Sequence, residues 1–219
     1  MFSIAIDGPA GAGKSTIAKR LAKDLKCIYI DTGAMYRSVA YYCLTNKINV
    51  NNEVEVNAII DDINIRLEIS EEGQLIFVNG EDVSTKIRNS EISLLASKVA
   101  TYMLVRQKLV SIQQAIAKER SVIMDGRDIG TTVLPFATLK VFLTASTTER
   151  ANRRFTEYVK DNPDITLEEV IEDIKKRDFQ DSTREISPLR KAEDAIEVDT
   201  TGITIEEIVT KIEALLKDR

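Results

Sequence analysis

The hydrophobic positions of this 219-residue chain form short apolar runs, separated by longer segments with helical spacing. Runs of four or five apolar residues are typical of strands that are buried on both faces. Four such runs and a weaker fifth lie at 2–6, 27–30, 121–124, 139–143 and 195–198. Helical patterns lie at 14–26, 34–46, 90–100, 102–119, 147–160, 166–184 and 204–217. This alternation predicts an α/β fold, with a five-stranded parallel sheet flanked by helices.

Three of the predicted helices begin with the pattern of a capping box. In this motif a Ser or Thr side chain and a Glu three residues later satisfy each other's backbone N–H groups. The pairs are Ser146 with Glu149, Thr166 with Glu169, and Thr204 with Glu207.

One region breaks the alternation of strands and helices. The segments "NINIRLEI" and "QLIFVNG" flank "SEEG", which predicts a β-hairpin over about 63–80. The hairpin is too polar for the central sheet, so we expect it to belong to a small insertion at about 60–100. Because no linker rich in Pro, Gly or Ser divides the chain, we expect a single domain over 1–219.

The composition narrows the possible chemistry. The chain has a net charge of −5, so an anionic substrate would need a local arginine cluster, and a general nucleic-acid surface is not expected. It has no histidine, which excludes Ser-His-Asp hydrolases, Cys-His proteases and His-ligated zinc sites. Cys27 and Cys43 have no CxxC spacing and are expected to be buried reduced thiols of a cytoplasmic protein. No apolar run approaches roughly 18 residues, and no signal-peptide pattern is present, so we expect no membrane segment.

Glycines gather directly after predicted strands, which is where ligands bind in parallel sheets. "GPAGAGKST" follows the first strand and opens a helix, and it matches the phosphate-binding pattern G-x-x-x-x-G-K-[ST]. The predicted triphosphate-binding loop consists of Gly8, Pro9, Ala10, Gly11, Ala12, Gly13, Lys14, Ser15 and Thr16. We expect Lys14 to reach the β- and γ-phosphates and Ser15 to place its hydroxyl on Mg²⁺. The alternative is a glycine-rich turn with a surface lysine.

Two more polar turns follow predicted strands. In "YIDTGAMYR", Thr32 can hydrogen-bond a ligand and Arg37 lies just over a turn later; a helix-capping Thr with a surface Arg is the alternative. In "MDGRDIGT", Asp125 is placed to orient the water shell of Mg²⁺. Arg127 suits a phosphate because its planar fork donates two parallel bonds, whereas an ionised Asp128 can only accept, for example from an exocyclic amine. A salt-bridged turn is the alternative.

Charged residues on two late helices form a third group. Arg177, Asp181 and Arg184 share one helix face by their i, i+4, i+7 spacing. The earlier helix carries a second basic face: Arg150, Arg153 and Arg154. With the polar loop "KDNPDIT" between them, the helices predict a hinged arm over about 150–185 that closes over a triphosphate and neutralises charge on a transferred group. Solvated salt-bridge ladders are the alternative. Arg106 is a lone Arg on its helix, and its pattern taken alone indicates a surface residue.

These motifs together resemble the bacterial cytidylate kinase family. "IDGPAGAGKST", "YIDTGAMYR", "DGRDIGT" and "RDFQDSTREISPL" occur in that order, and the resemblance covers essentially the whole chain. It implies a P-loop nucleoside monophosphate kinase in which the insertion binds the monophosphate and the arm is a lid. The implied reaction transfers the γ-phosphoryl group of ATP to CMP or dCMP, with Mg²⁺, giving the diphosphate and ADP.

The resemblance also implies roles for single residues. The cytosine contacts fall on Thr32, Arg106 and Asp128, the acceptor-phosphate contacts on Arg37, Arg127 and Arg184, and the ribose contacts on Arg177 and Asp181. The residues expected to act in catalysis are Lys14, Arg127, Arg150, Arg154 and Arg184. The chemistry of Asp128 agrees, because a carboxylate accepts from the N4 amine of cytosine and repels the O4 of uracil.

Two other functions remain open at this stage. One is a kinase for another monophosphate, such as UMP or AMP. The other is a nucleotide-dependent switch or binding module, although such a protein has no acceptor for two arginine groups to hold. The "NKIN" segment lacks the Asp of a guanine-reading N-K-x-D motif. We expect a monomer with small-molecule substrates and no nucleic-acid or membrane partner.

Overall fold

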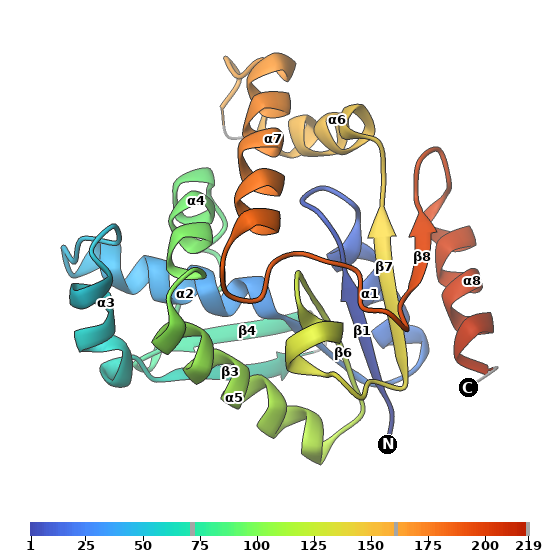
Figure 1. Cartoon of the computed structure of the whole chain (residues 1–219), viewed down its shortest axis with the longest axis horizontal. Coiled ribbons are helices and arrows are strands. Elements are labelled where there is room, and N and C mark those ends of the chain that lie inside the picture. Colours follow the sequence, from blue (N-terminus) through green and yellow to red (C-terminus); the bar gives the residue numbers. More distant parts are fainter. Residues whose placement is uncertain (71–72, 160–161, 218–219) are drawn as a thin grey trace.

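The computed structural model describes residues 1–70, 73–159 and 162–217, and it contains a five-stranded parallel sheet with helices on both faces (Figure 1). The strands are β1 (Ser3–Asp7), β2 (Ile28–Asp31), β6 (Val122–Gly126), β7 (Leu139–Thr144) and β8 (Ile196–Asp199). Their spatial order is β2-β6-β1-β7-β8, with every neighbouring pair parallel. The predicted sheet is confirmed, and each strand lies within two residues of its predicted ends.

The predicted helices are also found in the described chain. They are α1 (Lys14–Asp24), α2 (Thr32–Thr45), α4 (Ser90–Val99), α5 (Met103–Glu119), α6 (Thr147–Tyr158), α7 (Leu167–Thr183) and α8 (Ile205–Lys217). Residues 160–161 lie outside the described residues; they include the last position of the predicted 147–160 helix and the start of the loop between the two arm helices. Helix α3 (Glu53–Ile59) was not predicted, because Val56 is its single buried residue and it shows no apolar stripe. A 3₁₀ turn (Ile60–Asp62) and a π-helical turn (Ile129–Val133) were missed as well.

Both faces of the parallel sheet are covered, which explains why its strands are apolar at successive positions. Ile4 and Ile6 of β1 pack in one cluster with α1 and α8, while Ala5 between them packs in a second cluster with α5. The central strand is therefore held by packing on both of its faces. The loops that follow them carry the polar residues singled out from the sequence.

The predicted hairpin forms a second, antiparallel sheet. It consists of β3 (Ile65–Ser70), β4 (Gly73–Val78) and the short, unpredicted β5 (Glu81–Asp82), while 71–72 of the turn lie outside the described residues. Ile76 and Val78 pack in a separate hydrophobic cluster with α2, α3 and α4. Gln74 meets the edge of the parallel sheet, where its Oε1 accepts from the N–H of Asp31 at 2.9 Å.

Two of the three predicted capping boxes form completely: Thr166 with Glu169, and Thr204 with Glu207. The third prediction is half wrong. Ser146 accepts from the N–H of Glu149 at 3.2 Å, but the Glu149 carboxylate pairs with Arg153. The N–H of Ser146 instead donates to Thr201 Oγ1 at 3.0 Å, because β8 ends beside this helix start.

The two cysteines are free thiols, as expected. Cys43 is buried, whereas Cys27 is only half-buried. Burial raises the pKa of both thiols to about 11. Over the described ranges, none of the helices has the length and apolar character needed to cross a lipid bilayer.

Candidate active site

The carboxyl ends of the parallel strands open onto a cavity of about 770 Å³. Its walls come from the glycine-rich loop, the first turn of α2, helix α4, the loop after β6 and the two helices of the arm. In Figure 1 the arm stands above the tips of β1 and β7, and the insertion lies to one side. Segments far apart in the sequence thus meet at one site large enough for small-molecule ligands.

The glycine-rich loop has the conformation that a phosphate cradle requires. Gly11 and Gly13 have φ of +77° and +85°, which lie in the left-handed region that favours glycine. A Cβ on Gly8 would lie 2.1 Å from the carbonyl oxygen of Leu143, so only glycine lets the loop pass β7. Residues 10–16 line the cavity, while Gly8 and Pro9 support the loop from behind.

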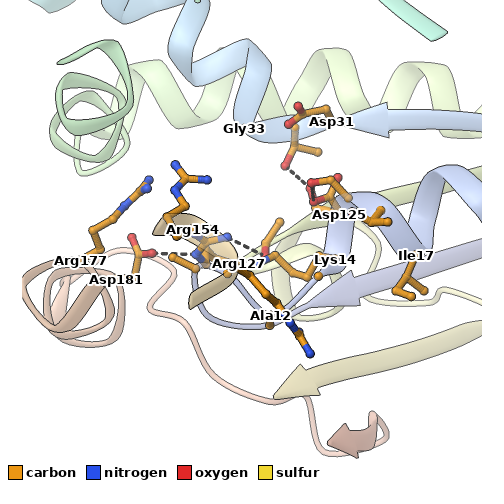
Figure 2. A pocket seen from close by; sticks show the side chains of 18 of the residues that line it. Ala12, Lys14, Ile17, Asp31, Gly33, Asp125, Arg127, Arg154, Arg177 and Asp181 are labelled. Atoms are coloured by element: carbon orange, nitrogen blue, oxygen red, sulfur yellow. Dashed lines mark hydrogen bonds and ion pairs between the residues drawn. The ribbon is translucent and has the colours of Figure 1, made fainter. Parts of the chain in front are cut away.

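Lys14 spans this loop rather than pointing to solvent. Its Nζ donates to the Pro9 carbonyl at 2.7 Å, and its side chain is buried in the cavity wall (Figure 2). Burial holds the pKa of Lys14 well below its usual range, and the positive charge of nearby Arg127 lowers it further. The negative charge of Asp125 opposes the shift. The partner of the buried ammonium is thus a carbonyl rather than a carboxylate, which suits a site for an anionic phosphate chain.

Asp125, at the end of β6, is held by two hydroxyl groups. Ser15 Oγ donates to its Oδ2 at 2.8 Å and Tyr29 OH donates to its Oδ1 at 2.8 Å. Burial raises the pKa of Asp125, the neighbouring Asp31 adds to the rise, and Lys14 opposes it. A hydroxyl and a carboxylate in contact are hard oxygen donors, which Mg²⁺ prefers when substrate phosphates and waters supply its other ligands. The residues present therefore fit this ion, and its binding here stays a prediction.

The first turn of α2 is arranged differently from the capping alternative. Asp31, not Thr32, caps the helix by accepting from the N–H of Ala34 at 2.9 Å, and it also pairs with Arg37 at 2.7 Å. Thr32 is buried in the cavity wall and donates to the carbonyl of Asp125 at 2.7 Å. Thr32 and Arg37 both line the cavity.

Asp128 lines the cavity between two arginines. Its carboxylate pairs with Arg106 and, at 3.3 Å, with Arg184. The surface position that the pattern of Arg106 alone indicated is wrong: the residue is 3% exposed, because the face of α5 that carries it turns into the cavity wall, where the family resemblance had placed it. Its guanidinium lies 5.6 Å from the ring centroid of Tyr36, whose pKa burial raises to about 12.

The arm brings its charged face to the cavity, as predicted. Asp181 of α7 accepts from Arg127 Nε at 2.7 Å, and Figure 2 shows both side chains beside Arg154 and Arg177. Burial alone would raise the pKa of Asp181, but Arg127 lowers it below its usual value. Burial and the neighbouring arginines lower the pKa of Arg177 to about 10.

Ser97 is a cavity residue that the sequence reasoning missed. Arg177 Nη2 donates to its Oγ at 3.4 Å, and Gln180 Nε2 donates to its carbonyl at 3.1 Å, so the arm touches α4 here. Ser93 lines the cavity one turn earlier. Two serines spaced i, i+4 on the buried face of a helix were the available signal.

Arg150 does not reach the cavity, although it was expected to act in catalysis. It is 6% exposed, and its Nη1 donates to the Ala10 carbonyl at 3.0 Å and to Asp178 at 2.7 Å. Its Nε donates to the Ala145 carbonyl and its Nη2 to Thr147 Oγ1, so each guanidinium nitrogen has a partner. The structure therefore places Arg150 outside the cavity lining, where it links the glycine-rich loop to α7, while Arg153 and Arg154 line the cavity.

Asp7 was also overlooked. The carboxylate at the end of β1 accepts from the N–H groups of Ile129 and Gly130 at 2.8 and 2.7 Å, which fixes the loop that carries Asp128. Burial raises the pKa of Asp7 to about 6. An acidic residue closing the first apolar strand, directly before the glycine-rich loop, was the signal in the sequence.

A parallel sheet with a phosphate-binding loop after its first strand, flanked by helices and crossed by an arginine-rich arm, defines the P-loop kinase class. The fold resembles a crystal structure of an uncharacterized protein from Eubacterium ventriosum ATCC 27560, with a TM-score of 0.53 at 12% identity over 100% of both chains. It also resembles a gluconokinase from Sinorhizobium meliloti 1021, with a TM-score of 0.50 at 14% identity over 99% of this chain and 92% of the other. These two likenesses concern the fold alone.

The sequence comparisons are more specific. The model of the family described as cytidylate kinase matches residues 4–218. A cytidylate kinase from Bacillus cereus strain B4264 is 50% identical over 98% of this chain and 96% of its own length. One from Bacillus thuringiensis strain Al Hakam is 50% identical over 96% of this chain and 94% of its own. The chain belongs to the cytidylate kinase family.

Proposed function

We propose that this protein transfers the γ-phosphoryl group of ATP to CMP or dCMP, giving ADP and CDP or dCDP. One observation carries the proposal: the phosphate-binding loop and the buried Asp128–Arg106 pair line the same cavity. A triphosphate and a base with an exposed amine can therefore occupy one site. Membership of the cytidylate kinase family supports the same substrates.

The acceptor nucleotide would lie between the insertion and the loop after β6. Asp128 accepts from the N4 amine of cytosine, and Arg106 donates to the O2/N3 side, with Thr32 beside them. Arg37 and Arg127 take the acceptor phosphate. For the ribose we propose the two charged residues of α7 that line the cavity: Arg177 and Asp181. The phosphate contact of Arg184 stays a prediction, since its guanidinium pairs with Asp128.

The donor triphosphate would lie along the glycine-rich loop. Lys14 and the start of α1 bind its β- and γ-phosphates, and Arg154 from the arm neutralises charge on the transferred group. Ser15 and, through water, Asp125 would hold Mg²⁺, which supplies positive charge between the phosphates when bound. No general base is needed, because the acceptor phosphate is already anionic at neutral pH, with a second pKa of about 6. Closing the arm would exclude water and so favour transfer over hydrolysis.

A coupled assay that supplies ATP and Mg²⁺ with CMP, dCMP, UMP or AMP tests the proposal. We expect CMP or dCMP to give the highest kcat/KM. A clear preference for UMP or AMP would assign the chain to another monophosphate. Tight nucleotide binding without transfer to any of the four would instead identify a switch or binding module.

We also propose that the enzyme is a monomer of the cytoplasm that acts on these small molecules without a nucleic-acid or membrane partner. The free thiols of Cys27 and Cys43 support a reducing compartment. The net charge of −5 supports the absence of a general nucleic-acid surface.

A further inference from the structure

Tyr29 is a buried residue of β2 whose ring and hydroxyl face different surroundings. The ring is 8% exposed and packs in the cluster that contains Ile17 and Leu21 of α1. Its hydroxyl crosses to the neighbouring strand and donates to Oδ1 of Asp125 at 2.8 Å. Strand pairing explains the reach, because β2 lies beside β6 with Asp31 and Asp125 in register. Tyr29 does not line the main cavity, so it approaches the Asp125 carboxylate from behind.

The other oxygen of the same carboxylate faces the glycine-rich loop. Asp125 Oδ2 accepts from Ser15 Oγ at 2.8 Å, so each carboxylate oxygen has one hydroxyl donor. With a single donor the carboxylate could rotate about its Cβ–Cγ bond, whereas two donors on opposite oxygens fix its plane. Because the Ser15 hydroxyl donates its proton to Asp125, the lone pairs of its oxygen remain available to a cation.

A structural role alone would not need this partner. A buried tyrosine hydroxyl requires one acceptor, and a backbone carbonyl is sufficient. Tyr102 is such a case: it is 4% exposed and donates to the carbonyl of Val50 at 2.8 Å. Tyr29 instead donates to the one carboxylate that contacts the loop serine.

We propose that Tyr29 is a positioning residue for the magnesium site, acting through Asp125 and Ser15. It would fix the plane of the carboxylate, so that Asp125 could orient a water of Mg²⁺ and Ser15 could offer its hydroxyl oxygen when the ion is bound. The inference rests on the proposed kinase function and deepens it by adding a residue behind the metal site. Losing a partner that orients a metal ligand commonly weakens metal affinity or activity by about 10- to 100-fold.

The test compares wild type, Tyr29→Phe and the matched control Tyr102→Phe. Each variant loses one buried hydroxyl and keeps its ring. ADP binding is measured by equilibrium titration in EDTA and across a series of Mg²⁺ concentrations. For Tyr29→Phe we expect unchanged ADP affinity in EDTA. The Mg²⁺ concentration that gives half of the Mg²⁺-dependent gain in ADP affinity, called here the Mg²⁺ midpoint, should rise about 10-fold or more. For Tyr102→Phe we expect the wild-type midpoint.

Turnover gives a second readout. In Tyr29→Phe, kcat should recover at high Mg²⁺ with an unchanged KM for CMP, which a general loss of folding would not produce. A third readout uses wild type labelled with 3-fluorotyrosine: one buried ¹⁹F resonance should shift when Mg²⁺ is added to the ADP complex. This measurement applies even if the Phe variant folds poorly.

These measurements distinguish a failure of the Tyr29 role from a failure of the kinase proposal. Any one of three results would overturn the role of Tyr29 and leave the kinase proposal intact. These are a wild-type Mg²⁺ midpoint in Tyr29→Phe, an equal loss of ADP affinity in that variant with and without Mg²⁺, and ¹⁹F resonances that do not shift when Mg²⁺ is added. Failure of the wild type to phosphorylate CMP, dCMP, UMP or AMP, or to bind ADP more tightly with Mg²⁺, would overturn both.

Discussion

Asp128 is a buried carboxylate whose negative charge is balanced by two guanidinium groups. Arg106 and Arg184 each pair with one of its oxygens, and the residue is 5% exposed. An ionised carboxylate offers only acceptors, so its natural partner on a base is an amine. This chemistry supports the proposal that Asp128 separates cytosine from uracil.

Replacing this carboxylate by an amide tests that assignment. In Asp128→Asn the side chain gains a donor that can meet the O4 of uracil, so the ratio of kcat/KM for CMP over UMP should fall by about 10- to 100-fold. The measurement is steady-state kinetics with both substrates. Asp24→Asn, at an exposed pair with Arg20, serves as a control and should keep the ratio. An unchanged ratio in Asp128→Asn would refute the base-reading role.

Asp7 permits a prediction about pH. Burial raises its pKa from 3.8 to about 6 in the folded protein, so between these values the folded protein binds more protons than the unfolded chain. Its contribution is therefore most favourable below pH 3.8 and is lost as the pH rises through about 6. Relative to Asp7→Asn, which cannot titrate there, wild type should lose about 3 kcal/mol of unfolding free energy across this window.

Urea denaturation of both proteins at several pH values measures this difference, since the other titrating groups largely cancel. The difference should be constant above about pH 7. A difference that grows in the opposite direction, with wild type gaining on the variant as pH rises, would contradict a raised pKa for Asp7.

At the scale of secondary-structure elements, Arg150 joins the arm to the glycine-rich loop. Its guanidinium bonds to the Ala10 carbonyl and to Asp178 of α7, so we expect movement of the arm to affect the phosphate site. In Asp178→Asn the buried guanidinium loses its counter-charge. We expect the KM for ATP to rise several-fold, the KM for CMP to change less, and stability to fall by about 1–2 kcal/mol.

Steady-state kinetics with each substrate varied in turn, together with denaturant unfolding, check this coupling. Glu172→Gln, at an exposed ion pair with Lys175 on the same helix, is the matched control and should leave both KM values unchanged. Equal effects of Asp178→Asn on the two KM values would argue against a specific link to the donor side.

The elements show what a sequence can and cannot predict. Strands such as Ser3–Asp7 were predictable because doubly buried strands are apolar throughout, and the glycine-rich loop because its spacing is specific. Arg106 was misplaced because helical spacing does not tell which face of α5 another segment covers. Arg150 was misassigned for a related reason: its i+4 neighbour Arg154 shares the cavity face of α6, yet the Arg150 side chain turns to the Ala10 carbonyl and Asp178.

At the scale of the whole molecule, the two halves of the cavity rest on different hydrophobic cores. The proposed acceptor side, on α2 and α4, packs on the cluster shared with the hairpin sheet. The proposed donor side, on the glycine-rich loop and α1, packs on the cluster shared with β1, β7 and α8. Damage to one core should therefore affect one substrate more than the other.

Ile76 of β4 provides the test, because it is 2% exposed in the acceptor-side cluster. Ile76→Ala removes buried methyl groups, which should cost about 2–5 kcal/mol of unfolding free energy. Because the wall bearing Tyr36 and Arg37 loses support, CMP affinity should fall more than ADP affinity in calorimetric titrations. Ile212→Ala, equally buried in the donor-side cluster, is the control and should spare CMP. Parallel losses for both ligands in Ile76→Ala would mean that the two cores act as one.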